Sequence, residues 1–289
     1  MKIFCLGILL SFSAFAENSK LIPVFMDAAQ IYTSKDESVR NAMVLDPKTR
    51  AVLNVLEEKK IDPAILQKYT QDKMRSSWKL PQDDQFDRWS YQPALKVEDV
   101  PEVALNAVKF DVVKSSEWLK DDIYVYFFVT DGVIPTGKVS SIYKEVASGQ
   151  SFFFNEIDRA IFPLQGISGK RPQNHLIVDY GVIESDGDDI KELQKLSSII
   201  IDIAIAVYTS YDPENSQIIV KLRKEIKALA DMLLSMNSDD RLVTSSFGFK
   251  NSELNSYFGD ETYIGFIKNH KSTSGKRWEY DLHFRLLKN

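Results

Sequence analysis

The chain has 289 residues, of which 44% are hydrophobic, 27% charged and 11% aromatic. This balance is typical of a globular protein and excludes a disordered, collagen-like or multi-span membrane chain. The formal net charge of −5 argues against a nucleic-acid partner, because general nucleic-acid-binding proteins carry a surplus of Lys and Arg. The length predicts one large domain or two modest ones.

The first 16 residues have the pattern of a secretory signal peptide. Lys2 precedes an apolar or small run over residues 3–15, which ends in Ala-Phe-Ala at residues 14–16, a small-x-small cleavage motif. A retained membrane anchor is the alternative, but the run is short for a bilayer span. We therefore expect the mature chain to begin at Glu17 and to be exported, to the bacterial periplasm or outside the cell.

Cys5 is the only cysteine, and it lies inside the predicted leader. The residues before it do not have the pattern that precedes a lipidated cysteine. A mature chain without a thiol cannot form disulfides, thiolate zinc sites or a cysteine nucleophile. The absence of disulfides favours a bacterial exported protein.

Residues 17–77 have a helical pattern. Two Asp-Pro pairs, at residues 46–47 and 62–63, each place an acidic N-cap before a proline at the first helical position. With a further apolar segment at residues 23–32, they predict a small helical bundle. Residues 78–103 follow as a connector without periodicity, whose aromatic side chains we expect to lie across a surface.

Residues 104–289 change to a strand pattern. Residues 123–130 and 176–183 are apolar on both faces, which predicts central strands covered on both sides. Residues 278–286 alternate apolar and polar side chains, which predicts a strand with one face in water. Shorter candidate strands occupy residues 108–113, 151–154 and 263–268.

Two helices interrupt these strands and are expected to form a hairpin at about residues 188–236. Asp202 interrupts the apolar first helix. Either this helix is buried on both sides and Asp202 pairs with a Lys or Arg or reaches solvent through a gap, or the hairpin inserts into a membrane. The predicted fold is α+β: an antiparallel β-sandwich with an inserted helical hairpin, preceded by a small helical N-terminal section.

Acidic residues gather where predicted elements end. An antiparallel hairpin brings its two ends together, so the acidic groups at residues 184–189 and 239–240 should converge. Carboxylates from separate loops can supply the six to eight oxygen ligands of Ca²⁺, although the spacing does not fit an EF-hand. The alternative is that these acids only cap a helix and solvate a turn. The candidate metal ligands are Asp131, Glu184, Asp186, Asp188, Asp239 and Asp240.

Two loops share the sequence Ser-Gly-Lys-Arg, at residues 168–171 and 274–277. Paired Gly-Lys-Arg loops can bind phosphate or sulfate groups. The alternative is that both are polar turns, and neither has the spacing of a Walker loop. The candidate anion-binding residues are Lys170, Arg171, Lys276 and Arg277.

Three of these features together resemble C2-like calcium-binding β-sandwich domains. They are a strand ending in Asp131-Gly132, a later strand running into Glu184-x-Asp186-x-Asp188, and the final aromatic strand. The resemblance covers residues 105–289 at most, and its motif is acidic residues in strand-end loops. It implies that Asp131, Asp186 and Asp188, together with Asp239 and Asp240, are calcium ligands.

The sequence contains no recognisable catalytic motif, and we assign no catalytic residue. Its histidines, His175, His270 and His283, are isolated along the chain, and no zinc-hydrolase or serine-hydrolase signature occurs. We expect an exported binding protein, with Ca²⁺ as candidate cofactor and a lipid, glycan or protein surface as candidate partner. The alternatives are a secreted hydrolase that uses strand-end carboxylates and a membrane-active protein that uses the hairpin.

Overall fold

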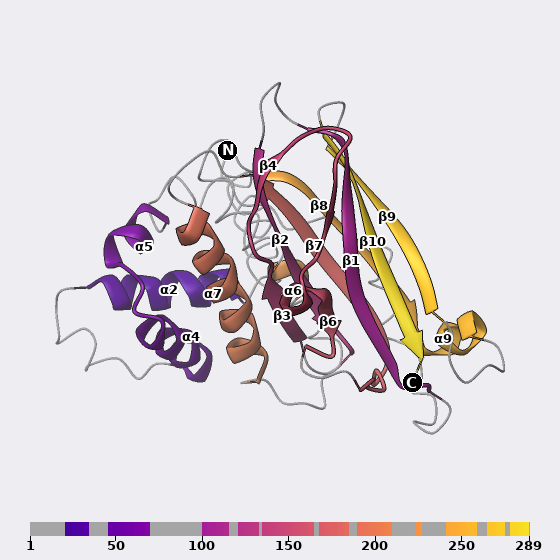
Figure 1. Cartoon of the computed structure of the whole chain (residues 1–289). Helices are drawn as coiled ribbons and strands as arrows, with labels where there is room; N and C mark the ends of the chain where they lie inside the picture. Colours follow the sequence, from indigo (N-terminus) through magenta and orange to yellow (C-terminus); the bar gives the residue numbers. More distant parts are fainter. Residues whose placement is uncertain are drawn as a thin grey trace, which may run out of the picture.

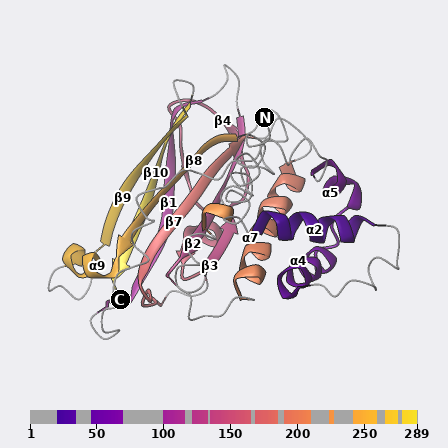
Figure 2. The same cartoon turned by 180° about the vertical axis from the view of Figure 1, so that it is seen from behind.

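A computed structural model describes residues 21–34, 46–69, 100–115, 121–132, 135–164, 168–184, 190–209, 223–226, 241–258, 265–274 and 278–288. Two antiparallel β-sheets lie face to face, and helices cover the outer face of one of them (Figure 1). The view from behind shows the same order of layers, with the helices of residues 21–69 and 190–209 on one side and strands β9 (Gly265–Ser274) and β10 (Trp278–Lys288) on the other (Figure 2). The predicted α+β sandwich is confirmed.

Sheet A has the strand order β5-β1-β10-β9, and β6 pairs with β1 beside β5. Sheet B has the order β3-β2-β7-β8, and β4 also pairs with β2. Strands β8 and β9 are in contact along one side of the sandwich. The strands of sheet A are β1 (Val103–Lys114), β5 (Ser151–Phe153), β6 (Ala160–Phe162), β9 (Gly265–Ser274) and β10 (Trp278–Lys288). The strands of sheet B are β2 (Asp121–Thr130), β3 (Pro135–Val139), β4 (Tyr143–Val146), β7 (His175–Glu184) and β8 (Arg241–Lys250).

Most of the described helices form the layer on sheet B, and two short ones lie against strands β1 and β8 instead. Helix α7 lies between β7 and β8 in the chain, where the first helix of the hairpin is predicted. Residues 223–226 of the second predicted helix are also helical. The rest of that second helix, together with residues 35–45 and 70–99, lies outside the described residues. The helices are α2 (Leu21–Thr33), α4 (Pro47–Glu58), α5 (Pro63–Tyr69), α6 (Glu156–Arg159), α7 (Ile190–Thr209) and α9 (Asn251–Phe258).

Strand β2 is buried on both faces, as its sequence predicts. Alternate side chains of a strand point to opposite faces, and here both sets are apolar. One set packs into the core between the two sheets, and the other packs against the helices. The first set is Ile123, Val125, Phe127 and Val129, and the second is Tyr124, Tyr126 and Phe128.

Strand β10 has one buried and one polar face, as predicted. Tyr280, Leu282, Phe284 and Leu286 are fully buried in the inter-sheet core. The residues between them are Glu279, Asp281, His283 and Arg285, which belong to the outer face of sheet A. The described helical layer packs on sheet B, so it leaves this outer face of sheet A uncovered.

The N-terminal helices pack on one another, as the sequence predicts, and they also join the rest of the helical layer. Helices α2, α4 and α5 share one core with α7 and with the helix-facing side chains of β2. The two Asp-Pro helix starts are confirmed, since Asp46 accepts from the N–H groups of Lys48 and Thr49, and Asp62 accepts from Ala64. The N-terminal section is therefore the outer part of a helical layer on sheet B.

The apolar surface of α7 is covered on both sides. Ile200, Ile203 and Val207 are buried in the core that α7 shares with sheet B and the N-terminal helices. Asp202 forms an ion pair of 2.8 Å with Lys59 at the end of α4, which confirms the pairing expected for a buried helix. None of the described helices is both long and apolar enough to cross a membrane.

The loss of stability on truncating a phenylalanine should depend on whether its side chain is buried between the sheets or exposed. Phe127 is fully buried between the sheets, whereas Phe153 on β5 is 66% exposed. We expect Phe127→Ala to lower the free energy of unfolding by about 3–5 kcal/mol, because it leaves a cavity. Phe153→Ala should change it by less than about 0.5 kcal/mol. Denaturant unfolding of both variants measures this, and similar losses would contradict the assigned layers.

Candidate functional site

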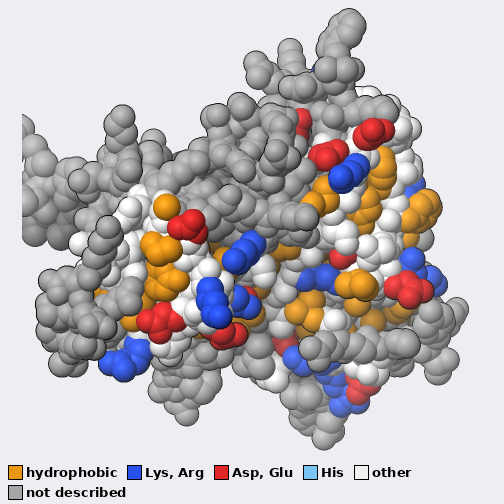
Figure 3. Space-filling model, turned by 60° about the vertical axis from the view of Figure 1, so that its left-hand side comes forward, with side chains coloured by type: hydrophobic (Ala, Val, Ile, Leu, Met, Phe, Trp, Pro, Cys, Tyr) orange, Lys and Arg blue, Asp and Glu red, His pale blue; other side chains and the backbone are white. Residues whose placement is uncertain are grey.

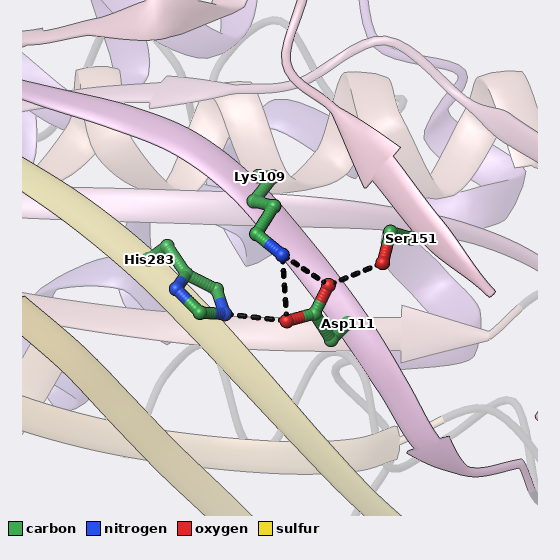
Figure 4. A network of polar contacts seen from close by, with 4 residues as sticks. All are labelled: Lys109, Asp111, Ser151 and His283. Carbon is green, nitrogen blue, oxygen red and sulfur yellow. Dashed lines mark hydrogen bonds and ion pairs between the residues drawn. The ribbon is translucent and has the colours of Figure 1, made fainter. Parts of the chain in front are cut away.

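A cluster of polar side chains lies on the outer face of sheet A. Lys109 and Asp111 belong to β1, Ser151 to β5 and His283 to β10 (Figure 4). The strand register brings them together, because Lys109 stands opposite His283 and Asp111 stands opposite Ser151. Opposite residues of neighbouring antiparallel strands share a face, so three strands contribute to one cluster.

Asp111 is the centre of this cluster. Lys109 Nζ lies 2.8 Å from Asp111 Oδ1 and 3.0 Å from Oδ2. Ser151 Oγ donates to Oδ1 at 2.5 Å, and His283 Nε2 lies 2.6 Å from Oδ2. A carboxylate offers about four lone-pair sites, so these contacts use its full capacity.

The electrostatics keep Asp111 ionised. Partial burial raises the pKa of Asp111, but hydrogen bonds from Lys109, Ser151 and His283 outweigh burial and lower this pKa from 3.8 to about 2. An ionised carboxylate only accepts hydrogen bonds, so His283 must carry its proton on Nε2. Asp111 therefore fixes the tautomer and orientation of His283.

The cluster does not have the arrangement of a Ser-His-Asp triad. A Ser-His-Asp triad needs the serine hydroxyl bonded to histidine, so that histidine can take its proton. Here Ser151 donates to Asp111, and a carboxylate with a pKa of about 2 is a weak base. What the cluster provides is three polar side chains held in fixed positions on the outer face of the sheet.

One predicted metal ligand and one predicted anion-binding residue pair with each other. Asp131 is 1% exposed, and its Oδ2 lies 2.8 Å from Lys170 Nζ. The main-chain oxygen of Asp131 also accepts from the N–H groups of Gln173 and Asn174, which ties the end of β2 to the start of β7. The ion pair joins two loops at this end of the sandwich.

The second basic residue of that loop also lies near a carboxylate. Arg171 Nε is 3.7 Å from Glu102 Oε1, and both side chains are about half exposed. Lys276 and Arg277, in the other Ser-Gly-Lys-Arg loop, lie outside the described residues. The structure therefore does not bring the four predicted anion-binding residues together within the part of the chain that it describes.

The predicted calcium ligands divide between two ends of sheet B. Thr130 stands opposite Ile177 and Ile123 opposite Glu184, so Asp131 and Glu184 are separated by the length of the β2–β7 ladder. That length is roughly 20 Å or more, which prevents both from binding one ion. Within the described residues, no three His, Cys, Asp or Glu side chains form a metal-binding group.

The remaining predicted ligands, Asp186, Asp188, Asp239 and Asp240, lie outside the described residues. The two segments that contain them attach to sheet B at Glu184 and Arg241. The register places Ile183 opposite Arg241, so both segments leave neighbouring strands at the same end of the sheet. This agrees with the convergence that an antiparallel hairpin predicts.

A buried ion pair fastens the helical layer to sheet B, and no local sequence pattern indicated it. Arg223 Nη1 lies 2.7 Å from Asp179 Oδ1, and Ser246 of β8 donates to the same oxygen. Both charged side chains are almost completely buried. Burial lowers the pKa of Arg223 to about 10. A buried pair of this kind is costly to break, because either partner alone leaves an uncompensated charge.

The strand pattern predicted that His283 lies on a polar face, but it did not indicate which residues His283 contacts. Lys109 and Asp111 lie in the predicted strand at residues 108–113, and Ser151 begins the one at residues 151–154. Their alternation with apolar residues was the available signal. It could not indicate the site, because Asp111 meets partners that are 40 positions away on β5 and 172 positions away on β10.

Comparisons with known proteins find little similarity to this chain. No family model matches the sequence, and no curated protein matches it. A solved structure to which the chain is similar is a C2 domain of plant extended synaptotagmin 1. The two are 10% identical, the match covers 65% of this chain and 95% of that one, and the TM-score is 0.30. That domain belongs to the family that the strand-end acids resemble.

Stability should fall as His175 is protonated. His175 is buried beside the Asp131–Lys170 pair; burial lowers its pKa from 6.5 to about 4, although Asp131 acts in the opposite direction. Because folding favours the neutral ring, full stability is present above about pH 6.5 and is lost toward pH 4, by up to about 3 kcal/mol. Denaturant unfolding of wild type and His175→Gln at several pH values measures this. Equal losses in both proteins would contradict the assignment.

Proposed function

We propose that this chain is an exported binding protein whose ligand surface is the outer face of sheet A around His283. The observation that carries the proposal is the four-fold hydrogen bonding of Asp111, which positions side chains from three strands. Groups held in place before the ligand arrives lose little entropy on binding, and that favours affinity. Export rests on the leader-like first 16 residues.

The chemistry of the cluster favours binding over the two alternatives. At this cluster a hydrolase would need a general base, and a carboxylate whose pKa is lowered to about 2 is a weak one. A membrane-active hairpin would need free apolar surface, but α7 is covered by sheet B and the N-terminal helices. On the side of the helical layer, acidic and basic side chains of the described residues lie between separate hydrophobic areas (Figure 3).

A screen of ligand classes tests the proposed surface. Thermal melts of the mature chain should be recorded with neutral oligosaccharides, with inorganic phosphate and nucleotides, and with free amino acids. We expect one class to raise the melting temperature of wild type by several degrees, because a ligand that binds only the folded state stabilises it.

The same class should leave the melting temperatures of His283→Ala and Asp111→Asn unchanged, when each variant is compared with itself in the absence of ligand. Asp27→Asn, which changes an exposed carboxylate on α2, is the matched control and should behave like wild type. A shift of equal size in wild type and His283→Ala would refute the surface, and so would the absence of a shift with every class.

Calcium binding is a second candidate function, favoured by one observation. The acidic segments that follow Glu184 and precede Arg241 leave neighbouring strand ends, since Ile183 stands opposite Arg241. Oxygen ligands from two such segments match the coordination that Ca²⁺ prefers. A site there would involve Asp186, Asp188, Asp239 and Asp240, with Glu184 beside them, and would leave Asp131 out.

Thermal melts in EDTA and in millimolar calcium test this second candidate. At 100 times its dissociation constant, calcium should stabilise the folded state by roughly 2.7 kcal/mol and raise the melting temperature by several degrees. The shift should disappear in the double variant Asp186→Asn/Asp188→Asn and persist in Asp27→Asn. Identical melts with and without calcium in wild type would leave these acids as helix caps and turn residues.

A further inference from the structure

The free hydrogen-bonding groups of the cluster define the chemistry of its ligand. Ser151 gives its only hydroxyl hydrogen to Asp111, so its oxygen can only accept a further bond. His283 donates from Nε2 to Asp111, which leaves Nδ1, on the side of the ring away from Asp111, for a ligand (Figure 4). Lys109 has three N–H groups and directs its contacts to one carboxylate, which leaves a donor for the ligand.

An exposed aromatic ring stands in the same row. Phe153 lies opposite Lys109 in the β1–β5 register, and Lys109 lies opposite His283, so the row runs from β5 through β1 to β10. Phe153 is 66% exposed, while its neighbour Phe152 stacks on Phe110 toward the core. The ring and His283 are two strand spacings apart, roughly 10 Å. That span suits a ligand of one or two sugar rings.

Two carboxylates in the row of Asp111 disfavour an anionic ligand there, while Arg285 lies further along the same outer face. Lys109 is neutralised by Asp111, and Asp281 stands opposite Asp111 in the register. A sulfate group would meet these carboxylates, and it has no hydrogen to give to Ser151 Oγ. A hydroxyl group, in contrast, both donates and accepts, so a polyhydroxylated ligand can bond Ser151 Oγ as a donor, Lys109 as an acceptor and Nδ1 of His283 as either.

From this pattern we propose that the outer face of sheet A binds a neutral carbohydrate, an inference that rests on the proposed function. The hydroxyl groups of the sugar hydrogen-bond Lys109, Ser151 and His283, and the apolar face of a sugar ring packs on Phe153. A few fixed polar groups beside an apolar platform are the usual composition of a small-ligand site. Asp111 is a positioning residue, since its own bonding capacity is already used.

Native gel electrophoresis through embedded polysaccharides tests this inference. The full mature chain is run in gels containing neutral polymers, namely soluble β-glucan, mannan, xylan and dextran, and in gels containing the anionic polymer dextran sulfate. We expect at least one neutral polymer to retard wild type. Phe153→Ala, which removes an exposed ring, should weaken this binding by about tenfold, the size of one aromatic contact.

Two further variants complete the design. His283→Ala should also lose retardation, and its thermal melt shows whether it remains folded. Ile157→Ala is the matched control, because Ile157 is the most exposed large hydrophobic side chain among the described residues, at 83%. Ile157 lies on α6. Its main-chain oxygen accepts a hydrogen bond from Lys138 of β3, in the other sheet, as does that of Ala160 in β6. This variant should run like wild type.

The outcomes separate the carbohydrate inference from the proposed function. Retardation by dextran sulfate alone, lost in His283→Ala, would overturn the carbohydrate inference and leave the surface in place. Retardation by a neutral polymer that is unchanged in Phe153→Ala and His283→Ala would overturn both. If no polymer retards wild type, the carbohydrate inference fails, and the screen of ligand classes decides the surface independently.

Discussion

The two-sided burial of β2 and β7 is the constraint on which the rest of the structure depends. Alternate residues of β2, such as Phe127 and Phe128, carry large apolar side chains to opposite faces of sheet B. Each face must be covered, because apolar surface of this size is costly to leave in water. Sheet A covers one face and the helical layer covers the other. The order of the three layers follows from these strands.

This arrangement determines which surface is free for a ligand. Sheet A is the outermost layer, so its strands need only one apolar face, and β1 and β10 alternate accordingly. The polar face carries Asp111 with its three partners, and these side chains are partly exposed. On the helix side, polar groups are buried and paired instead, as Asp179 is with Arg223. Buried charge there holds the layers together, whereas partly exposed charge on sheet A can serve binding.

The parts of the fold that were predictable have strong local signals. Helix starts at Asp46-Pro47 and Asp62-Pro63 follow from local N-cap chemistry, and the long strands follow from periodicity. Strand β8 and helix α9 were missed, because residues 241–250 contain Ser-Ser and Gly and residues 251–258 form a short, weakly apolar helix. Ser246 stands opposite Asp179, so its polarity serves a partner that is distant in sequence.

The sequence alone determined the two-sided central strands, the one-sided last strand and the helical insertion between them. These depend on side-chain periodicity, which neighbouring residues express without help from the rest of the chain. Only the tertiary structure decided that the N-terminal helices join α7, that Asp131 and Glu184 lie at opposite ends of sheet B, and that Asp111 gathers Lys109, Ser151 and His283. Each of these depends on which strands and helices pair, and pairing is set by contacts between distant segments that no local pattern encodes.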